Sequence, residues 1–249
     1  NLLSGIRENV DERAQFHQID IRNSVALGHV MDSGIDGVVH LAAQTSVRAS
    51  WDDPVGYADT NISGTLSVVQ HCVEYGVNTL VFSSSAAVYG KTTVLPIGEG
   101  SLLRPESPYA VSKHAGEQYV RVFARKYGFN PCILRFSNVY GPRQRCSGES
   151  GVVAIFADSI VKGQPVCIFG NGQQTRDFIF VSDVATAVAS AVELGVNCTL
   201  NISTGKRTTI LELYETIAHE VNQDPGIEYA PERKGDVLFS QLDNSTARA

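Results

Sequence analysis

The sequence predicts an α/β fold in which a doubly wound parallel sheet is joined to a smaller α+β lobe. Short apolar and β-branched runs alternate repeatedly with helical stretches in the first part of the chain, the pattern of strand–helix–strand units. The run 37–43 is apolar throughout, as in strands buried on both faces of a sheet. After Gly141-Pro142-Arg143 this rhythm changes, and shorter elements follow.

The first part of the chain is expected to contain four strands and three helices. Asn23 or Ser24 can cap a first helix to about Asp32, and Ser107-Pro108 opens the third. The second helix has Leu66, Val69 and Val73 on one apolar stripe. The expected strands are 15–20, 37–43, 79–85 and 132–136, and the two longer helices are 57–75 and 108–127.

The later part is expected to form a second lobe. Thr209 and Glu212 form a capping-box pattern that opens a helix over 210–222. The other expected elements are a helix at 151–162, strands at 165–169, 176–181 and 197–203, and a helix from Ser182. We therefore predict a Rossmann-like domain over 1–145 and a ligand-binding lobe over 146–249, with the strand 176–181 returning to the first domain.

The glycine fingerprint G-x-G-x-x-G, which follows the first strand of doubly wound dinucleotide binders, is missing. Gly34-x-x-Gly37 precedes a strand and is expected to be a turn. We therefore expect the amino-terminal βαβ unit to be absent and the first domain to be truncated at its start. On this expectation the chain alone binds a dinucleotide weakly or not at all, and an inactive chain is one of the open outcomes.

Composition excludes several classes of protein. The net charge of −6 gives no basic surface for nucleic acid, and no apolar run approaches the roughly 20 residues that span a bilayer. The five cysteines form no C-x-x-C pair and lie mostly in apolar runs, which indicates reduced thiols and a cytoplasmic protein. His40, His71 and His114 lack metal-ligand spacing, so no metal site is expected.

Ser85, Tyr109 and Lys113 are the best candidates for catalysis. Tyr109 and Lys113 are four residues apart at the start of a helix and so share one face. A nearby ammonium favours phenolate and is expected to lower the pKa of Tyr109, which could then take a hydroxyl proton. Ser85, at the carboxyl end of the preceding strand, could relay that proton. The Y-x-x-x-K pattern alone is weak, because it arises by chance in a chain of this composition.

Seven motifs together carry a resemblance to a known family. They are HLAAQ (40–44), Asn61-x-x-Gly64-Thr65, VFSSSAAVYG (81–90), YAVSK (109–113), RFSNVYGPRQ (135–144), GNGQQTRDFIFVSDVA (170–185) and PERKGDV (231–237). In this order they resemble the extended short-chain dehydrogenase/reductase family. Within it they are most similar to NAD-dependent sugar-nucleotide epimerases of the UDP-glucose/UDP-GlcNAc 4-epimerase type. The resemblance covers essentially the whole chain, apart from the missing glycine fingerprint.

The resemblance implies NAD as cofactor and assigns residues to it. Asp20 and Ile21 match a pair that flanks the adenine, although Asp20 fits equally well an ordinary residue at a strand end. Asn61 matches a residue that braces the active-site loop, and Lys113 one that holds the nicotinamide ribose. The full implied cofactor set is Asp20, Ile21, Leu41, Ala42, Ala43, Asn61, Tyr109 and Lys113.

The resemblance also implies a UDP-sugar substrate. Arg176 and Arg233 match contacts to the diphosphate, which suits the guanidinium fork. Cys167, Ile168 and Phe169 match a strand that lies against the uracil. The implied substrate-binding set is Ser85, Asn138, Cys167, Ile168, Phe169, Arg176, Arg233, Asp236 and Ser240. A small residue at position 240 is expected to leave room for an N-acetyl group.

Ala86 and Ala87 discriminate between reactions within the resemblance. Related dehydratases and decarboxylases carry carboxylic acids at these positions, and a methyl group cannot move a proton. The resemblance therefore implies inversion of C4 of a UDP-hexose or UDP-N-acetylhexosamine through a 4-keto sugar, in nucleotide-sugar metabolism, and a homodimer built from helices 57–75 and 108–127. The open alternatives are another sugar-nucleotide enzyme of the family, such as a UDP-glucuronate epimerase or a reductase, and an inactive nucleotide-binding fragment.

Overall fold

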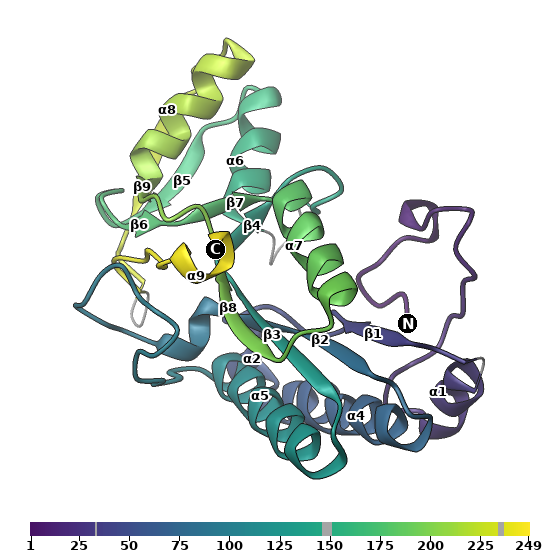
Figure 1. The fold of residues 1–249 in the computed structure, drawn as a ribbon. Coiled ribbons are helices and arrows are strands. Elements are labelled where there is room, and N and C mark those ends of the chain that lie inside the picture. The colour runs from purple at the N-terminus through teal and green to yellow at the C-terminus, as the bar shows by residue number, and fades with distance from the viewer. Residues whose placement is uncertain (33, 146–150, 234–236) are drawn as a thin grey trace. The chain divides into compact units, whose positions relative to one another are not determined.

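The computed structural model describes residues 1–249 apart from 33, 146–150 and 234–236. The chain forms two compact units, each assembled from three segments (Figure 1). The first unit comprises Asn1–Val88, Pro105–Leu134 and Val188–Thr199, and the second comprises Tyr89–Arg104, Arg135–Ala187 and Leu200–Ala249. Among the described residues, no helix combines the length and apolar character needed to cross a membrane.

A four-stranded sheet in the order β1-β2-β3-β8 organises the first unit. Its strands are β1 (Gly37–His40), β2 (Thr79–Ser85), β3 (Asn130–Phe136) and β8 (Cys198–Ile202). β1 pairs with β2 in parallel, from Gly37 opposite Thr79 to His40 opposite Phe82. The predicted Rossmann-like parallel sheet is confirmed, but β1 ends at His40, so residues 41–43 follow the strand instead of extending it.

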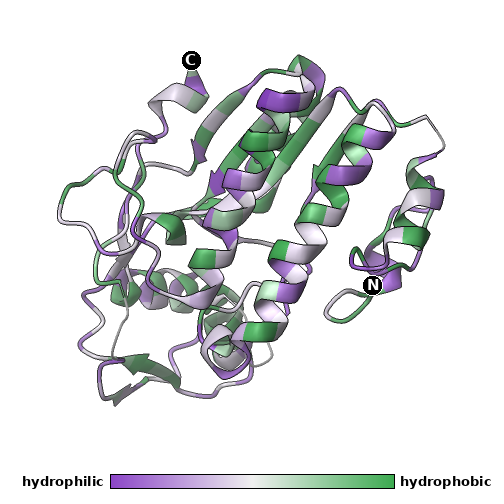
Figure 2. Ribbon diagram, turned by 90° about the horizontal axis from the view of Figure 1, so that it is seen from below, coloured by the Kyte–Doolittle hydropathy of each residue, from purple (hydrophilic) through white to green (hydrophobic). Residues whose placement is uncertain are grey.

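Helices cover both faces of this sheet (Figure 1). On one face, α1 (Ser24–Met31), α4 (Gly64–Glu74) and α5 (Pro108–Tyr127) bury Leu27, Val69 and Val120 against strand residues such as Phe82 and Ile133. On the other face lies the later part of α7 (Val181–Leu194), where a Cβ placed on Gly37 would lie 3.6 Å from Val192. Figure 2 shows that α4 and α5 alternate between hydrophobic and hydrophilic residues, as one-sided burial requires.

The helix starts follow the local sequence signals. The Asn23 side chain accepts a hydrogen bond from the Ala26 amide at the start of α1, and Ser107 does the same for Ala110 at the start of α5. Gly128, with φ of 84°, ends α5 in the left-handed conformation that glycine adopts without steric cost. Both helices therefore have the bounds that their capping residues predict.

The segment predicted as one helix over 57–75 is divided. After the short helix α2 (Ala49–Asp52), α3 (Pro54–Ala58) leads into a π-helical turn at Asp59–Ser63, and α4 follows directly. A π-turn accommodates one additional residue and is often associated with functional sites. Asn61 lies in the middle of this turn and is 2% exposed.

The prediction of a strand over 15–20 is wrong. Apart from a short 3₁₀ turn at Arg7–Asn9, residues 1–20 form no regular element. The segment forms no strand ladder: the Ile19 amide donates to the His17 carbonyl, and the Ile19 carbonyl accepts from the Asn1 amino group. Only Phe16, Ile19 and Asp20 of the predicted strand are even half-buried.

The core of the second unit lies between two helices and a pair of strands. The helices α6 (Val152–Val161) and α8 (Ile210–Val221) bury Phe156, Ile160 and Leu213 against β5 (Val166–Phe169). β5 pairs in parallel with β10 (Ile227–Ala230). The predicted capping box is confirmed, since the side chains of Thr209 and Glu212 each accept the other's backbone N–H.

Two small strand pairs and a short last helix complete the second unit. β4 (Asn138–Tyr140) pairs in parallel with β7 (Phe178–Phe180), and β6 (Thr175–Arg176) pairs antiparallel with β9 (Thr208–Thr209). The predicted strand 176–181 is therefore two strands broken at Asp177, and α7 begins already at Val181. The last element is α9 (Ser245–Arg248).

Asp177, between β6 and β7, has a buried carboxylate with several partners. It is fully buried and accepts hydrogen bonds from the backbone amides of Thr204, Gly205 and Leu242 and from the Thr204 hydroxyl. One carboxylate thus fixes the turn after β8 and the C-terminal segment around Leu242.

Candidate active site

Ser85, Tyr109 and Lys113 lie together in the first unit, where the end of β2 meets the start of α5. Ser85 is the last residue of β2, and its Oγ accepts a hydrogen bond from the Ala87 amide at 3.2 Å. Tyr109 and Lys113 are 8% and 5% exposed, and the Tyr109 hydroxyl lies within interaction range of the Ser85 side chain. A serine and a phenol are thus held together in a nearly dry environment, one turn from an ammonium group.

Lys113 is directed at the β2 backbone. Its Nζ donates to the Ser83 carbonyl at 2.8 Å and lies 5.4 Å from the centre of the Phe82 ring. Burial lowers the pKa of Lys113 to about 8, because taking an ammonium out of water disfavours its charged form. Near neutral pH the group remains largely protonated and can donate to a ligand hydroxyl.

The prediction that Lys113 lowers the pKa of Tyr109 is wrong for this structure. Burial raises the pKa of Tyr109, and the nearby Tyr57 acts in the same direction. The Ser85 hydroxyl acts in the opposite direction, because a donated hydrogen bond stabilises a phenolate. The cause of the difference is that the Lys113 ammonium faces the Ser83 carbonyl. Ser85 is therefore the group that favours deprotonation of Tyr109 here.

Glu117 joins the same face of α5 and was not predicted from the sequence. It is fully buried and accepts a 2.6 Å hydrogen bond from the Ser84 hydroxyl, with Arg121 at 3.3 Å from its other oxygen. Ser83 and Ser84, which precede Ser85, are thus each tied to α5 by a charged side chain. A sequence signal existed, because Tyr109, Lys113 and Glu117 are spaced by four residues.

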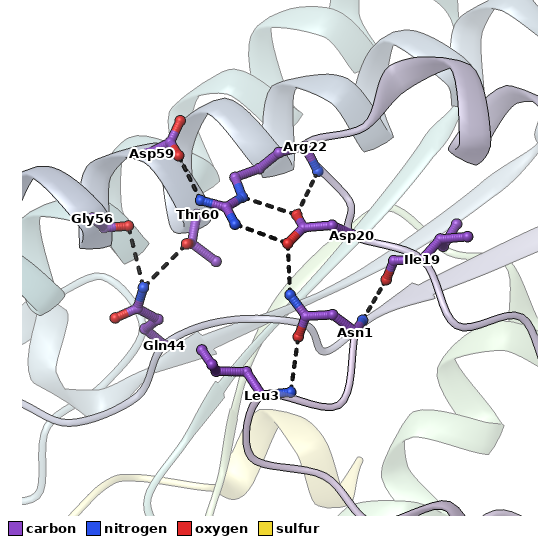
Figure 3. Close-up of polar contacts among 9 residues, drawn as sticks. All are labelled: Asn1, Leu3, Ile19, Asp20, Arg22, Gln44, Gly56, Asp59 and Thr60. Carbon is purple, nitrogen blue, oxygen red and sulfur yellow. Dashed lines mark hydrogen bonds and ion pairs between the residues drawn. The ribbon is translucent and has the colours of Figure 1, made fainter.

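Asn61 braces the loop after β1, as the resemblance implies. Its side-chain oxygen accepts from the Gln44 amide at 2.8 Å, and its nitrogen donates to the Gln44 carbonyl and to Ser112 Oγ, each at 2.9 Å. The Gln44 side chain returns to the Gly56 carbonyl and to Thr60 (Figure 3). The π-turn, the loop and α5 are therefore joined through one amide.

Residues 41–43 form the loop that Asn61 braces. Leu41 is 54% exposed, Ala42 is exposed and Ala43 is half-buried. An exposed apolar segment at the carboxyl end of a parallel strand is where open α/β sheets bind their ligands. These three predicted residues and Asn61 therefore occupy one neighbourhood.

Asp20 lies in an ion-pair cluster (Figure 3). Arg22 pairs with Asp20 at 2.8 Å and with Asp59 of the π-turn at 2.7 Å, and the Asn1 side chain donates to Asp20 at 2.6 Å. Arg22 holds the pKa of Asp20 well below its usual range. The cluster fixes the position of Asp20, whose carboxylate stays ionised.

Ile21 turns inward. It packs against the core of the first unit, and a Cβ placed on Gly64 would lie only 2.6 Å from its Cδ1 atom. The glycine in the pattern Asn61-x-x-Gly64 is thus required by the close approach of Ile21.

The second unit contains a pocket of about 370 Å³. Phe169, at the end of β5, lines it together with Arg233, whose guanidinium carbon lies 3.5 Å from the centre of the Phe169 ring. The other lining residues are Gly170, Asn171, Gln173, Gln174, Glu232, Leu238 and Phe239. An aromatic face, a guanidinium and several side-chain amides suit a ligand that has both a planar ring and negative charge.

The remaining predicted substrate residues fall outside this lining. Ile168 is buried in the core, because neighbouring residues of a strand point to opposite faces, while Cys167 is exposed. Asn138 lies exposed at the start of β4, and Arg176 on β6 donates to the Thr175 carbonyl at 2.9 Å. Ser240 is half-buried beside the lining residue Phe239. Asp236 lies outside the described residues.

The site in the first unit fits NAD chemically. Lys113 supplies a buried cationic donor, the Ser85–Tyr109 pair supplies a hydroxyl system, and residues 41–43 supply an exposed apolar strand end. No group of three or more metal-ligating side chains occurs among the residues that the structure describes. A parallel α/β sheet with a serine at a strand end and Y-x-x-x-K on the next helix defines an enzyme of the short-chain dehydrogenase/reductase type.

Comparison with known proteins identifies the family. The model of the NAD dependent epimerase/dehydratase family matches residues 2–203. UDP-glucose 4-epimerase of Mycolicibacterium smegmatis is 37% identical over 255 residues, covering 100% of this chain and 82% of that protein. The chain therefore belongs to the NAD dependent epimerase/dehydratase family, in its extended short-chain dehydrogenase/reductase branch.

Solved structures agree with this assignment. UDP-glucose 4-epimerase of Thermotoga maritima, with UDP-glucose, is 40% identical with a TM-score of 0.97, over 99% of this chain and 81% of that one. UDP-N-acetylglucosamine 4-epimerase of Methanobrevibacter ruminantium is 35% identical with a TM-score of 0.96, over 100% of this chain and 81% of that one.

His40 connects β1 to the Asn61 region. It is 4% exposed, and its Nε2 lies 2.9 Å from Thr65 Oγ1, while the Thr65 hydroxyl donates to the Asn61 carbonyl. Since that hydroxyl proton is engaged, His40 Nε2 must carry the proton that it donates to Thr65. Burial, and secondarily the Lys113 charge, lower the pKa of His40 to about 3.

We expect His40 to make the protein less stable as pH falls. The pKa in the folded state lies near 3, whereas an unfolded histidine has a pKa of about 6.5, so the unfolded state takes up the proton first. This stability is fully present above about pH 6.5 and is lost progressively toward pH 3. Between pH 7 and pH 5 the free energy of unfolding should fall by roughly 2 kcal/mol from this group.

Urea unfolding at several pH values measures this effect. The pH-dependent loss should shrink by that amount in His40→Asn and stay unchanged in His29→Asn, which replaces an exposed histidine of α1. Identical pH slopes for the native protein and His40→Asn would contradict a buried neutral His40.

Proposed function

We propose that this protein is an isomerase, an NAD-dependent 4-epimerase that inverts C4 of a UDP-hexose or UDP-N-acetylhexosamine. The observation that carries the proposal is the pairing of the Ser85 side chain with the buried Tyr109 phenol, followed by Ala86 and Ala87 in the 3₁₀ turn after β2. The serine and phenol can move one hydroxyl proton, and the two alanines offer no acid or base for elimination or decarboxylation.

In the proposed reaction Tyr109 receives the proton of the sugar 4-hydroxyl and later returns it, with Ser85 as the hydrogen-bonding partner. Lys113 would donate from its buried ammonium to a ribose hydroxyl of the cofactor. NAD, when bound, supplies the hydride acceptor and donor. The cofactor-binding residues proposed are Asp20, Ile21, Leu41, Ala42, Ala43, Asn61, Tyr109 and Lys113.

The proposed nucleotide site is the pocket of Phe169 and Arg233. The Phe169 ring offers a stacking face for the uracil, and the Arg233 guanidinium offers paired N–H groups to phosphate oxygens. The resemblance alone supports six further proposed substrate residues: Arg176, Asn138, Cys167, Ile168, Asp236 and Ser240. We accordingly propose NAD binding for residues 1–145 and nucleotide-sugar binding for 146–249. A cytoplasmic location also stays a prediction.

Replacing Tyr109 by Phe tests the mechanism. The variant keeps the ring but loses the proton acceptor, and groups of this kind contribute about 10²–10⁴-fold. We expect kcat for UDP-galactose conversion to fall by well over 100-fold, measured with NAD in excess. Tyr127→Phe, at the exposed end of the same helix, is the matched control and should keep full activity. An active Tyr109→Phe enzyme would refute the proposed role.

The size of residue 240 is proposed to set the sugar preference. A serine here leaves room for an acetamido group, so UDP-GlcNAc and UDP-GalNAc should be accepted alongside or above the plain hexoses. Overpacking by a larger side chain costs about 1–3 kcal/mol, which corresponds to roughly 5- to 150-fold in kcat/KM.

Comparing kcat/KM for UDP-GlcNAc and UDP-glucose tests this preference. In Ser240→Tyr the ratio should fall at least about 5-fold, the lower limit of that overpacking cost. In Ser240→Ala it should stay as in the native protein, because the residue remains small. A ratio that the tyrosine leaves unchanged would remove Ser240 from the site.

We further propose a homodimer in which α5 and the neighbouring helices pair with a second copy. Val55 on α3 is 76% exposed, and Val111, Tyr119 and Val122 on α5 are 48%, 39% and 48% exposed. Val120 and Phe123 pack inward instead. One apolar side of α5 thus packs into the core, and the second apolar side is left exposed for a partner.

Light scattering measures this assembly. The native protein should have the mass of a dimer, and the double variant Tyr119→Glu/Val122→Glu should shift toward monomer, because charges would then be buried without partners. Leu194→Glu, at an exposed position of α7 on the other face of the sheet, is the control. A native monomer at high concentration would contradict the proposal.

A further inference from the structure

Cys132 and Cys198 are paired across neighbouring strands. Cys132 lies on β3 and Cys198 on β8, which are adjacent in the sheet. Their sulfur atoms are 3.0 Å apart, although 66 residues separate them along the chain. Cys132 is fully buried and Cys198 is half-buried, so Cys198 is the partly exposed residue of the pair.

The strand geometry permits a covalent bond between them. Adjacent strands lie about 4.7–4.9 Å apart, within the roughly 4.4–6.8 Å that separates the Cα atoms of disulfide-bonded cysteines. A disulfide bond is about 2.05 Å long, so the two sulfur atoms have about 1 Å to close. Rotation of the two side chains can supply this movement while the backbone ladder stays in place.

We propose that Cys132 and Cys198 are a reversible thiol modification site, which hydrogen peroxide converts to a disulfide across β3 and β8. The Cys198 thiolate attacks the peroxide, the O–O bond breaks, and a sulfenic acid and hydroxide form. The Cys132 thiol gives its proton to the hydroxide and attacks the sulfenic sulfur, so that the S–S bond forms and the S–O bond breaks. The hydroxide that leaves takes up the proton that Cys198 released on forming its thiolate. Two thiols and one peroxide thus give one disulfide and two waters, and a dithiol reductant reverses the reaction.

The surroundings assign the order of these steps. The hydrogen bond between the two sulfur atoms, together with burial, raises the pKa of Cys132, and the same hydrogen bond lowers the pKa of Cys198. Cys198 is also the more exposed thiol. The thiolate is the nucleophile in such chemistry, so Cys198 reacts first and Cys132 resolves.

The other described cysteines differ from this pair. Cys72 is buried in the apolar core of the first unit, where burial raises its pKa to about 12. Cys167 is exposed in the second unit and serves as the matched control for simple surface oxidation. The disulfide would close a loop from 132 to 198 and stabilise the folded state by restricting the unfolded chain.

Peptide mapping by mass spectrometry tests the proposal. The native protein is treated with a small molar excess of hydrogen peroxide, and its remaining thiols are alkylated before digestion. We expect a linked peptide pair containing Cys132 and Cys198 that dithiothreitol separates. The Tm should rise by on the order of 5–10 °C, and amide exchange in β8 should slow.

Variants distinguish this site from general oxidation. Cys132→Ser should hold the reaction at a Cys198 sulfenic acid, which dimedone captures, whereas Cys198→Ser should leave Cys132 as a free thiol. Cys167→Ser should form the linked pair as the native protein does. If native protein treated with peroxide retains both thiols, or forms the link only after unfolding in urea, the proposal is wrong.

Discussion

The close packing of α5 on β2 is the constraint on which the rest of the first unit depends. A Cβ placed on Gly116 would lie 2.5 Å from the tip of the Phe82 ring, so only glycine lets the helix approach this strand. At that distance Lys113 reaches the Ser83 carbonyl and Glu117 reaches the Ser84 hydroxyl. The contacts at Ser83 and Ser84, neighbouring residues of β2, come from successive turns of α5. These contacts therefore fix the position of the Ser85–Tyr109 pair.

This arrangement places two charged side chains in the protein interior, where they add little to the stability of the folded state. Lys113 and Glu117 are both buried; each is hydrogen-bonded to a neutral group of β2, and Glu117 is also paired with Arg121. Such groups are costly to desolvate, and an apolar pair of similar volume would often be as stable or more so. The proposed chemistry explains their presence, because it needs a cationic donor on α5 and a rigid strand end.

Much of the fold could be predicted from local sequence signals. Capping residues located α1, α5 and α8, and apolar runs located β1, β2 and β3, because these signals are properties of neighbouring residues. The strand expected over 15–20 failed because an apolar pattern does not reveal whether a strand has a ladder partner. The π-turn was missed because its apolar spacing differs from that of an α-helix by a single residue.

The residues of the candidate site could be predicted from the sequence, but the direction of their pKa shifts could not. The resemblance selected Ser85, Tyr109, Lys113 and Asn61, and the structure places them around β2, α5 and the loop after β1. The direction of the Tyr109 pKa depends on where the Lys113 ammonium points, which no spacing rule contains. Similarly, the alternation along β5 separates Ile168 from Phe169, although both belong to one matching motif.

The π-turn at Asp59–Ser63 affects which side chains of α3 and α4 face the core. The extra residue in the π-turn rotates α4 about the helix axis relative to α3. The side chains of α3 and α4 therefore do not continue one common apolar face. The phase of α3 is set by Asp53, which caps it at Gly56, and that of α4 by Val68, Val69 and Cys72 in the core. Asn61 lies in the π-turn between the two helices, so the direction of its side chain follows neither helix face. Its amide can therefore face the loop after β1 and Ser112 while both helices keep their own faces buried.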